Sequence, residues 1–84
     1  MIMWVRSQDK KRLTNVEDVR ILEQNNGDYN IWGNNNCNLG KYSTEEKALK
    51  VLDMIEQSVS GFIDEEVAEF YQYGIFQMPQ DSEV

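Results

Sequence analysis

The stretch STEEKALKVLDMIEQSVSG, residues 43–61, carries the strongest structural signal in the chain and predicts a helix over about residues 44–60. Ser43 is the predicted N-cap because its hydroxyl accepts a hydrogen bond from a first-turn N–H, and Glu46 completes a capping box. Gly61 is expected to adopt the left-handed conformation that ends many helices. Apolar residues recur at helical spacing along one face, namely Ala48, Val51, Leu52, Ile55 and Val59. The helix is therefore expected to lie on a sheet.

Apolar and alternating runs on both sides of this helix predict strands over residues 2–7, 13–16, 19–25, 28–33, 39–42 and 75–78. Between two of them, Asn26-Gly27 predicts a two-residue type I′ hairpin that places Leu22 opposite Ile31 and Ile21 opposite Trp32. We expect a single α+β domain spanning residues 1–84. It consists of a small antiparallel sheet of four to five strands packed by one long helix (about 44–60), a second short helix (about 64–73) and a final strand (about 75–78).

The predicted hairpin is apolar on both faces. Its register places Val19, Ile21 and Trp32 on one face and Tyr29, Leu22 and Ile31 on the other. Because the long helix covers only one face, the other meets a second helix, a partner subunit or a ligand, or it carries ordinary exposed apolar residues. A chain of 84 residues has a modest core of its own, so we expect a homo-oligomer.

Composition argues against enzymatic chemistry. The chain has no histidine, which removes the usual general base and the commonest transition-metal ligand. Glu65, Glu66 and Glu69 are typical of a solvated helix start, and the single Cys37 has no partner for a disulfide. We therefore expect no enzyme, no catalytic residues, no metal and no cofactor. No run is apolar enough for a membrane span or a signal peptide, so we expect a cytoplasmic protein without membrane contact.

The formal net charge of −7 is unevenly distributed. Residues 1–42 hold six Lys/Arg and five Asp/Glu, whereas residues 43–84 hold two and ten. The acidic half repels nucleic acid, so no direct nucleic-acid contact is expected, and an anionic ligand belongs with the basic half. Guanidinium groups suit phosphate oxygens and stack on aromatic rings. The predicted ligand-binding residues are Trp4, Arg6, Arg12, Arg20 and Trp32. Alternatively, these arginines balance the acidic helices within or between subunits.

Three segments resemble a group of small uncharacterised phage and prophage proteins of Gram-positive bacteria. They are MWVRSQDK at residues 3–10, LGKYSTEEKALKVLDMI at residues 39–55 and FQMPQD at residues 76–81. The resemblance implies a setting in the cytoplasm of an infected host cell. Small acidic phage accessory proteins of this kind commonly counter host defence, either by binding a defence protein or by sequestering its nucleotide signal.

Two hypotheses follow from the residues and the resemblance together. The first is a non-enzymatic anti-defence protein that sequesters a nucleotide-type immune signal as a homo-oligomer. Arg6, Arg12 or Arg20 would contact phosphate, and Trp4 or Trp32 would contact a base. The alternative is an acidic protein inhibitor of a host defence nuclease, a nucleic-acid mimic similar in principle to anti-CRISPR proteins. Its carboxylates would be Asp53, Glu56, Asp64, Glu65, Glu66 and Glu69.

Overall fold

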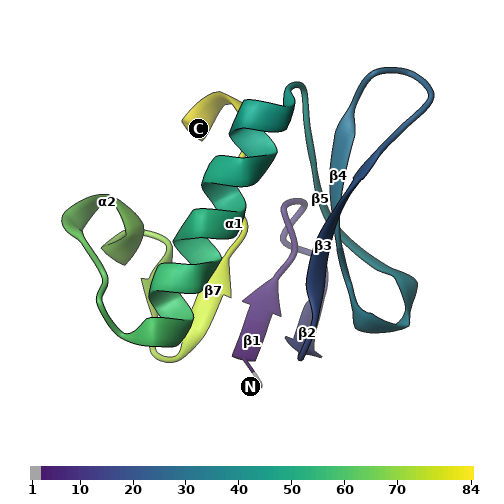
Figure 1. Cartoon of the computed structure of the whole chain (residues 1–84). Coiled ribbons are helices and arrows are strands. Elements are labelled where there is room, and N and C mark those ends of the chain that lie inside the picture. The colour runs from purple at the N-terminus through teal and green to yellow at the C-terminus, as the bar shows by residue number, and fades with distance from the viewer. Residues whose placement is uncertain (1–2) are drawn as a thin grey trace.

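The computed structural model describes residues 3–84, which form two small sheets, one long helix and a four-residue helix (Figure 1). The α+β class, the long helix, the short second helix and the C-terminal strand are confirmed. The elements are β1 (Met3–Arg6), β2 (Leu13–Val16), β3 (Val19–Glu23), β4 (Tyr29–Gly33), the 3₁₀ turn η1 (Asn34–Asn36), β5 (Cys37–Tyr42), α1 (Glu45–Ser60), α2 (Glu65–Ala68), β6 (Tyr71–Gln72), β7 (Ile75–Gln77) and the 3₁₀ turn η2 (Asp81–Glu83).

The four-stranded sheet has the order β2-β1-β7-β6 and joins the two ends of the chain. β1 pairs antiparallel with β2 and parallel with β7, where Trp4 lies opposite Ile75. β6 and β7 form a hairpin through Tyr73 and Gly74, whose φ angles of 56° and 79° are those of a type I′ turn. The second helix was predicted to reach residue 73, but it ends at Ala68 because the next residues pair with β7 instead.

The three-stranded sheet has the order β3-β4-β5. In its first hairpin, Gln24 donates its N–H to the Asp28 carbonyl and Gly27, with a φ of 90°, donates to the Gln24 carbonyl. The predicted two-residue turn is therefore wrong: the loop has three residues, with glycine in the left-handed position. The register moves by one residue, so Ile21 lies opposite Ile31. Ile31 is fully buried, whereas Leu22, on the opposite face, is exposed.

α1 packs against all three strands of the smaller sheet. Its N-cap is Thr44, whose hydroxyl accepts the Lys47 N–H, so the prediction of Ser43 is wrong by one residue. Ser43 instead donates its N–H and hydroxyl to Asp81. The prediction of Gly61 as the C-terminal stop is confirmed by its φ of 84°. The buried face of α1 consists of Ala48, Val51, Met54, Ile55 and Ser58, whereas the predicted Leu52 and Val59 are half-buried.

One hydrophobic core serves both sheets. Val5 and Phe76 reach it from the four-stranded sheet, and Ile31, Leu39 and Tyr42 reach it from the three-stranded sheet; all five are almost completely buried. In Figure 1, β3, β4 and β5 lie on the right of the view, β1 and β7 lie nearer the centre, and α1 runs through the middle. Among residues 3–84, no helix is both long and apolar enough to cross a membrane.

Candidate functional site

A cleft of about 350 Å³ lies at the turn between β1 and β2. Four of the eight Lys/Arg residues of the chain line it, together with two aliphatic side chains and no carboxylate. We call this site the basic cleft and define it by Arg6, Lys10, Lys11, Arg12, Leu13 and Ile75. Four cations around one cavity repel one another, so this arrangement favours an anion as its occupant.

The β1–β2 turn that presents these cations is held by its own hydrogen bonds. Ser7, which is 4% exposed, donates its hydroxyl to Asp9 at 2.6 Å and accepts the Arg12 N–H at 3.1 Å. Asp9 also accepts the Lys11 N–H. These hydrogen bonds, first that of Ser7 and then that of Lys11, lower the pKa of Asp9 below its usual value. The Asp9 carboxylate is thus engaged within the turn and does not line the basic cleft.

Both arginines of the basic cleft are anchored by neutral groups. Arg6 Nε donates to the Lys10 carbonyl at 3.0 Å, and Arg12 Nη1 donates to Cys37 Sγ at 3.4 Å. Within residues 3–84, neither guanidinium lies within 4.0 Å of a carboxylate oxygen. Within residues 3–84, neither arginine is therefore ion-paired with a carboxylate of the acidic helices, although the charge of Arg12 contributes to the lowered pKa of Asp9 in the same turn.

Trp4 lies beside the basic cleft. It points to the same outer face of β1 as Arg6, opposite Ile75 of β7, and remains 47% exposed. An exposed indole next to guanidinium groups provides a stacking surface for a flat ring.

The five predicted ligand-binding residues separate into two groups. Trp4, Arg6 and Arg12 belong to the basic cleft and its border. Arg20 and Trp32 are cross-strand neighbours on the outer face of the three-stranded sheet, and Arg20 forms an ion pair with Asp18 at 3.3 Å. Sequence reasoning missed Leu13 and Ile75 as lining residues. No local pattern places Ile75 beside Arg6, because the parallel pairing of β1 and β7 joins segments about 70 residues apart.

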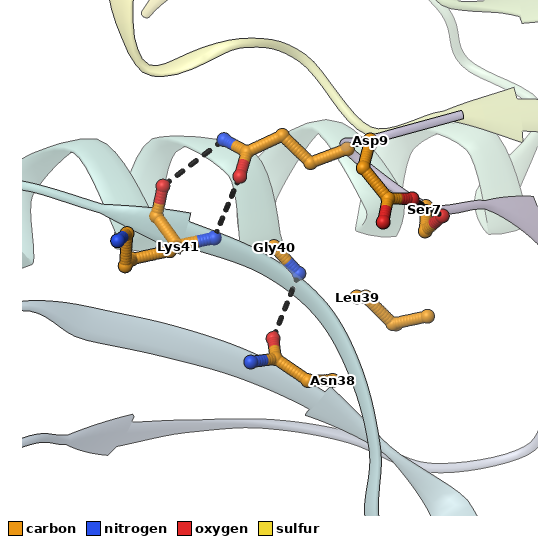
Figure 2. A pocket seen from close by; sticks show the side chains of 7 residues that line it. Ser7, Asp9, Asn38, Leu39, Gly40 and Lys41 are labelled. Atoms are coloured by element: carbon orange, nitrogen blue, oxygen red, sulfur yellow. Dashed lines mark hydrogen bonds between the residues drawn. The ribbon is translucent and has the colours of Figure 1, made fainter. Parts of the chain in front are cut away.

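A second cavity, of about 330 Å³, lies between the β1–β2 turn and β5 (Figure 2). The Gln8 carboxamide donates to the Lys41 carbonyl and accepts the Lys41 N–H, and Asn38 Oδ1 accepts the Gly40 N–H. The Gln8 N–H donates to the Leu39 carbonyl. Gln8 therefore joins the β1–β2 turn to β5 along this cavity, which makes it a structural seam between the two segments.

The acidic residues gather elsewhere. Six carboxylates on α1, on α2 and beside it are exposed, and among residues 3–84 none lies within 4.0 Å of a Lys or Arg nitrogen. They are Asp53, Glu56, Asp64, Glu65, Glu66 and Glu69. This acidic surface is open to a cationic partner.

The chemistry available at the basic cleft is electrostatic binding and stacking. Ser7 is buried with its hydroxyl hydrogen-bonded on both sides, so it is not presented to an occupant as a nucleophile. Within the described part of the chain, no three His, Cys, Asp or Glu side chains are grouped so as to hold a metal ion. Comparisons of the chain with protein-family models, with curated proteins and with solved structures give no match.

Proposed function

We propose that this protein binds a phosphate-bearing nucleotide in the basic cleft and sequesters it without converting it. One observation carries the proposal: in a chain of net charge −7, four cations without a carboxylate surround one cavity. Phosphate oxygens would accept hydrogen bonds from Arg6 and Arg12, and a base would stack on Trp4. Arg20 and Trp32, which were predicted for the same role, lie on the other sheet and take no part in this site.

The resemblance to phage and prophage proteins supplies the biological setting for this proposal. In an infected host cell, removal of a nucleotide immune signal would act against the defence system that responds to it. A protein in this role must bind the signal tightly and be present in many copies, and it needs no catalytic group.

Isothermal titration calorimetry tests the binding. The wild-type chain is titrated with cyclic di- and trinucleotides and with cyclic ADP-ribose variants, and chromatography of the recovered ligand reports whether it is unchanged. Lys11→Ala is expected to weaken binding about tenfold by removing a charge-assisted contact. Lys41→Ala, on β5 outside the cleft, is the matched control and is expected to bind as the wild type does. Failure of every nucleotide to bind would remove the proposal.

We further propose that the protein acts as a homo-oligomer through the outer face of the three-stranded sheet. Leu22 is 42% exposed there, beside the half-buried Trp32 and the Arg20–Asp18 ion pair. An apolar centre with a charged rim is typical of subunit interfaces. Light scattering is expected to give a mass above that of the 9.9 kDa chain, and Leu22→Lys is expected to lower it towards the monomer. A monomeric mass for the wild type would contradict this.

The acidic surface on α1 and α2 supports a second candidate function, inhibition of a host defence nuclease by mimicry of nucleic acid. Its six carboxylates have no intramolecular ion pair within residues 3–84, as a surface that meets a basic groove requires. The test is retention of a purified basic nuclease on the immobilised protein at low and at moderate salt, with loss as salt rises. Retention that is unaffected when Glu65 and Glu66 are changed to Gln would argue against mimicry.

A further inference from the structure

We infer that the basic cleft is a two-point clamp for a ligand that carries two phosphate groups. This inference rests on the proposed function and specifies the chemical class of its ligand: nucleoside diphosphates, doubly phosphorylated nucleotides or dinucleotides. It is carried by the way in which the two arginines are held.

Within residues 3–84, each arginine of the basic cleft makes a hydrogen bond through one guanidinium nitrogen and none through the other two. Arg6 gives its Nε hydrogen to the Lys10 carbonyl, which leaves both terminal amino groups for a ligand. Arg12 gives one Nη1 hydrogen to Cys37 Sγ, which leaves Nε and Nη2. An exposed arginine ordinarily loses much rotamer freedom when it binds. Anchoring removes part of that loss in advance, so these two side chains are preorganised as hydrogen-bonding forks.

The two forks occupy different positions because their anchors belong to different elements. Arg6 is held by the β1–β2 turn, where Lys10 adopts a left-handed φ of 66°. Arg12 is held by Cys37, a buried residue at the start of β5. Both nevertheless line the same cleft. Two fixed forks in one cavity fit two linked phosphate groups better than they fit one.

The charge of the cleft leads to the same conclusion. Its four cations carry a formal charge of +4, and the Asp9 carboxylate of the same turn, which interacts with Lys11 and Arg12 but does not line the cleft, reduces this to a net +3. A single phosphate monoester brings only about −1.5 to −2 at neutral pH. A second phosphate group brings the ligand charge closer to that of the site and gives Lys10 and Lys11 an anionic partner as well.

Calorimetry with matched probes tests the clamp on the full-length chain. The probes are AMP against ADP and inorganic phosphate against pyrophosphate. ADP is expected to bind about 10–100-fold more tightly than AMP, because its second phosphate adds charge-assisted hydrogen bonds. Arg6→Lys and Arg12→Lys are each expected to reduce this preference, since lysine lacks the fork. Arg20→Lys, on the other sheet, is the control and is expected to preserve it.

Cys37 does not line the cleft, so substitutions at Cys37 test the anchoring of Arg12 separately from contact with the ligand. Cys37→Ala removes the acceptor that holds Arg12 and is expected to weaken ADP binding about 3–10-fold. Cys37→Ser retains an acceptor and is expected to restore most of the affinity. Circular dichroism establishes that both variants are folded. Equal weakening by the two variants would remove the anchoring role of Cys37.

The outcomes separate the clamp from the proposed function. Equal affinity for AMP and ADP, or no binding of ADP, pyrophosphate and the dinucleotides at millimolar concentration while a nucleotide with one phosphate group binds, overturns the clamp and leaves the proposed function standing. Absence of binding by all nucleotides overturns both.

Discussion

Tyr42 is the residue that ties the C-terminal segment to the core. Its side chain is fully buried, and its hydroxyl donates to the Pro79 carbonyl at 2.7 Å. Burial first, and then the charges of Asp81 and Glu83, raise the pKa of this phenol, so the hydroxyl keeps its proton at any ordinary pH. This buried hydrogen bond, together with the Gln8 Nε2 donor to the same carbonyl, holds the C-terminal segment beside β5.

Tyr42→Phe is expected to destabilise the protein by about 1 kcal/mol, because the Pro79 carbonyl loses the Tyr42 donor and keeps only the longer hydrogen bond from Gln8 Nε2, at 3.2 Å. The measurement is urea unfolding at neutral pH. Tyr73→Phe is the matched control: Tyr73 is 98% exposed at the tip of the β6–β7 turn, and its change is expected to fall within about 0.5 kcal/mol. Equal stability of the two variants would contradict the role of the buried hydroxyl.

Asp81 adds a second, pH-dependent tie to the same segment. The Ser43 N–H is the main cause of its lowered pKa, with contributions from the Ser43 hydroxyl and from Lys47. Because the folded pKa lies below the unfolded value of about 3.9, the stabilisation is fully present above pH 4. It is lost as the pH falls through the folded pKa.

Asp81→Asn is therefore expected to lower the urea midpoint at pH 7 and to have less effect at pH 3. The ionised carboxylate that the variant lacks is also lost by the wild type in acid. Unfolding curves for both proteins at pH 7, 4 and 3 measure this difference. A gap of the same size at all three pH values would show that Asp81 acts through packing and not through its charge.

At the level of elements, α1 is defined by its caps. Thr44 closes the first turn through the Lys47 N–H, and Gly61 ends the helix in the left-handed conformation. Ser43, the predicted cap, is drawn away by Asp81 of η2. Two adjacent hydroxyl residues both suit the N-cap position, and a contact from the far end of the chain decides between them.

Thr44→Ala is expected to destabilise the protein by about 1 kcal/mol through loss of the N-cap. Ser43→Ala keeps the backbone N–H bond to Asp81 and loses only an exposed hydroxyl contact, so a smaller effect of about 0.5 kcal/mol or less is expected. Thermal unfolding followed by circular dichroism compares the two. The reverse order of stability would place the cap at Ser43 after all.

On the scale of the whole molecule, charge is segregated. The basic cleft concentrates cations at the β1–β2 turn, and the exposed carboxylates of α1 and α2 repel one another. Raising the ionic strength from about 0.01 M to 0.1 M shortens the Debye length from about 30 Å to 10 Å and weakens that repulsion.

We expect this change in salt to raise the midpoint of thermal unfolding by about 2–4 °C, which corresponds to roughly 0.5 kcal/mol for a domain of this size. Glu56→Gln removes one carboxylate near the end of α1, where the helix has no basic residue in its last turn. Its melting temperature is expected to depend less on salt. A melting temperature that falls with salt would contradict net repulsion in the folded state.

Local signals in the sequence predicted much of this fold. The helical spacing of residues 44–60, the glycine at 61 and the strand at residues 13–16 are properties of neighbouring residues, and the structure agrees with them. The predicted hairpin register was wrong because Asn25, Asn26 and Gly27 suit both a two-residue and a three-residue loop. The three-residue loop prevails because it places the partly buried Ile21 and the buried Ile31 together on the core face.

For the candidate site too, neighbouring residues determined one part and contacts between distant segments determined the other. Arg6 and Arg12 come together because they flank one short turn, so the sequence by itself determined that these cations would be neighbours. Only the tertiary structure decided that Ile75 would line their cleft, that Cys37 would anchor Arg12, and that Arg20 and Trp32 would lie on another sheet. Helix and turn preferences act over a few residues, whereas strand pairing joins segments through the shared burial of apolar faces, which no short stretch of sequence specifies.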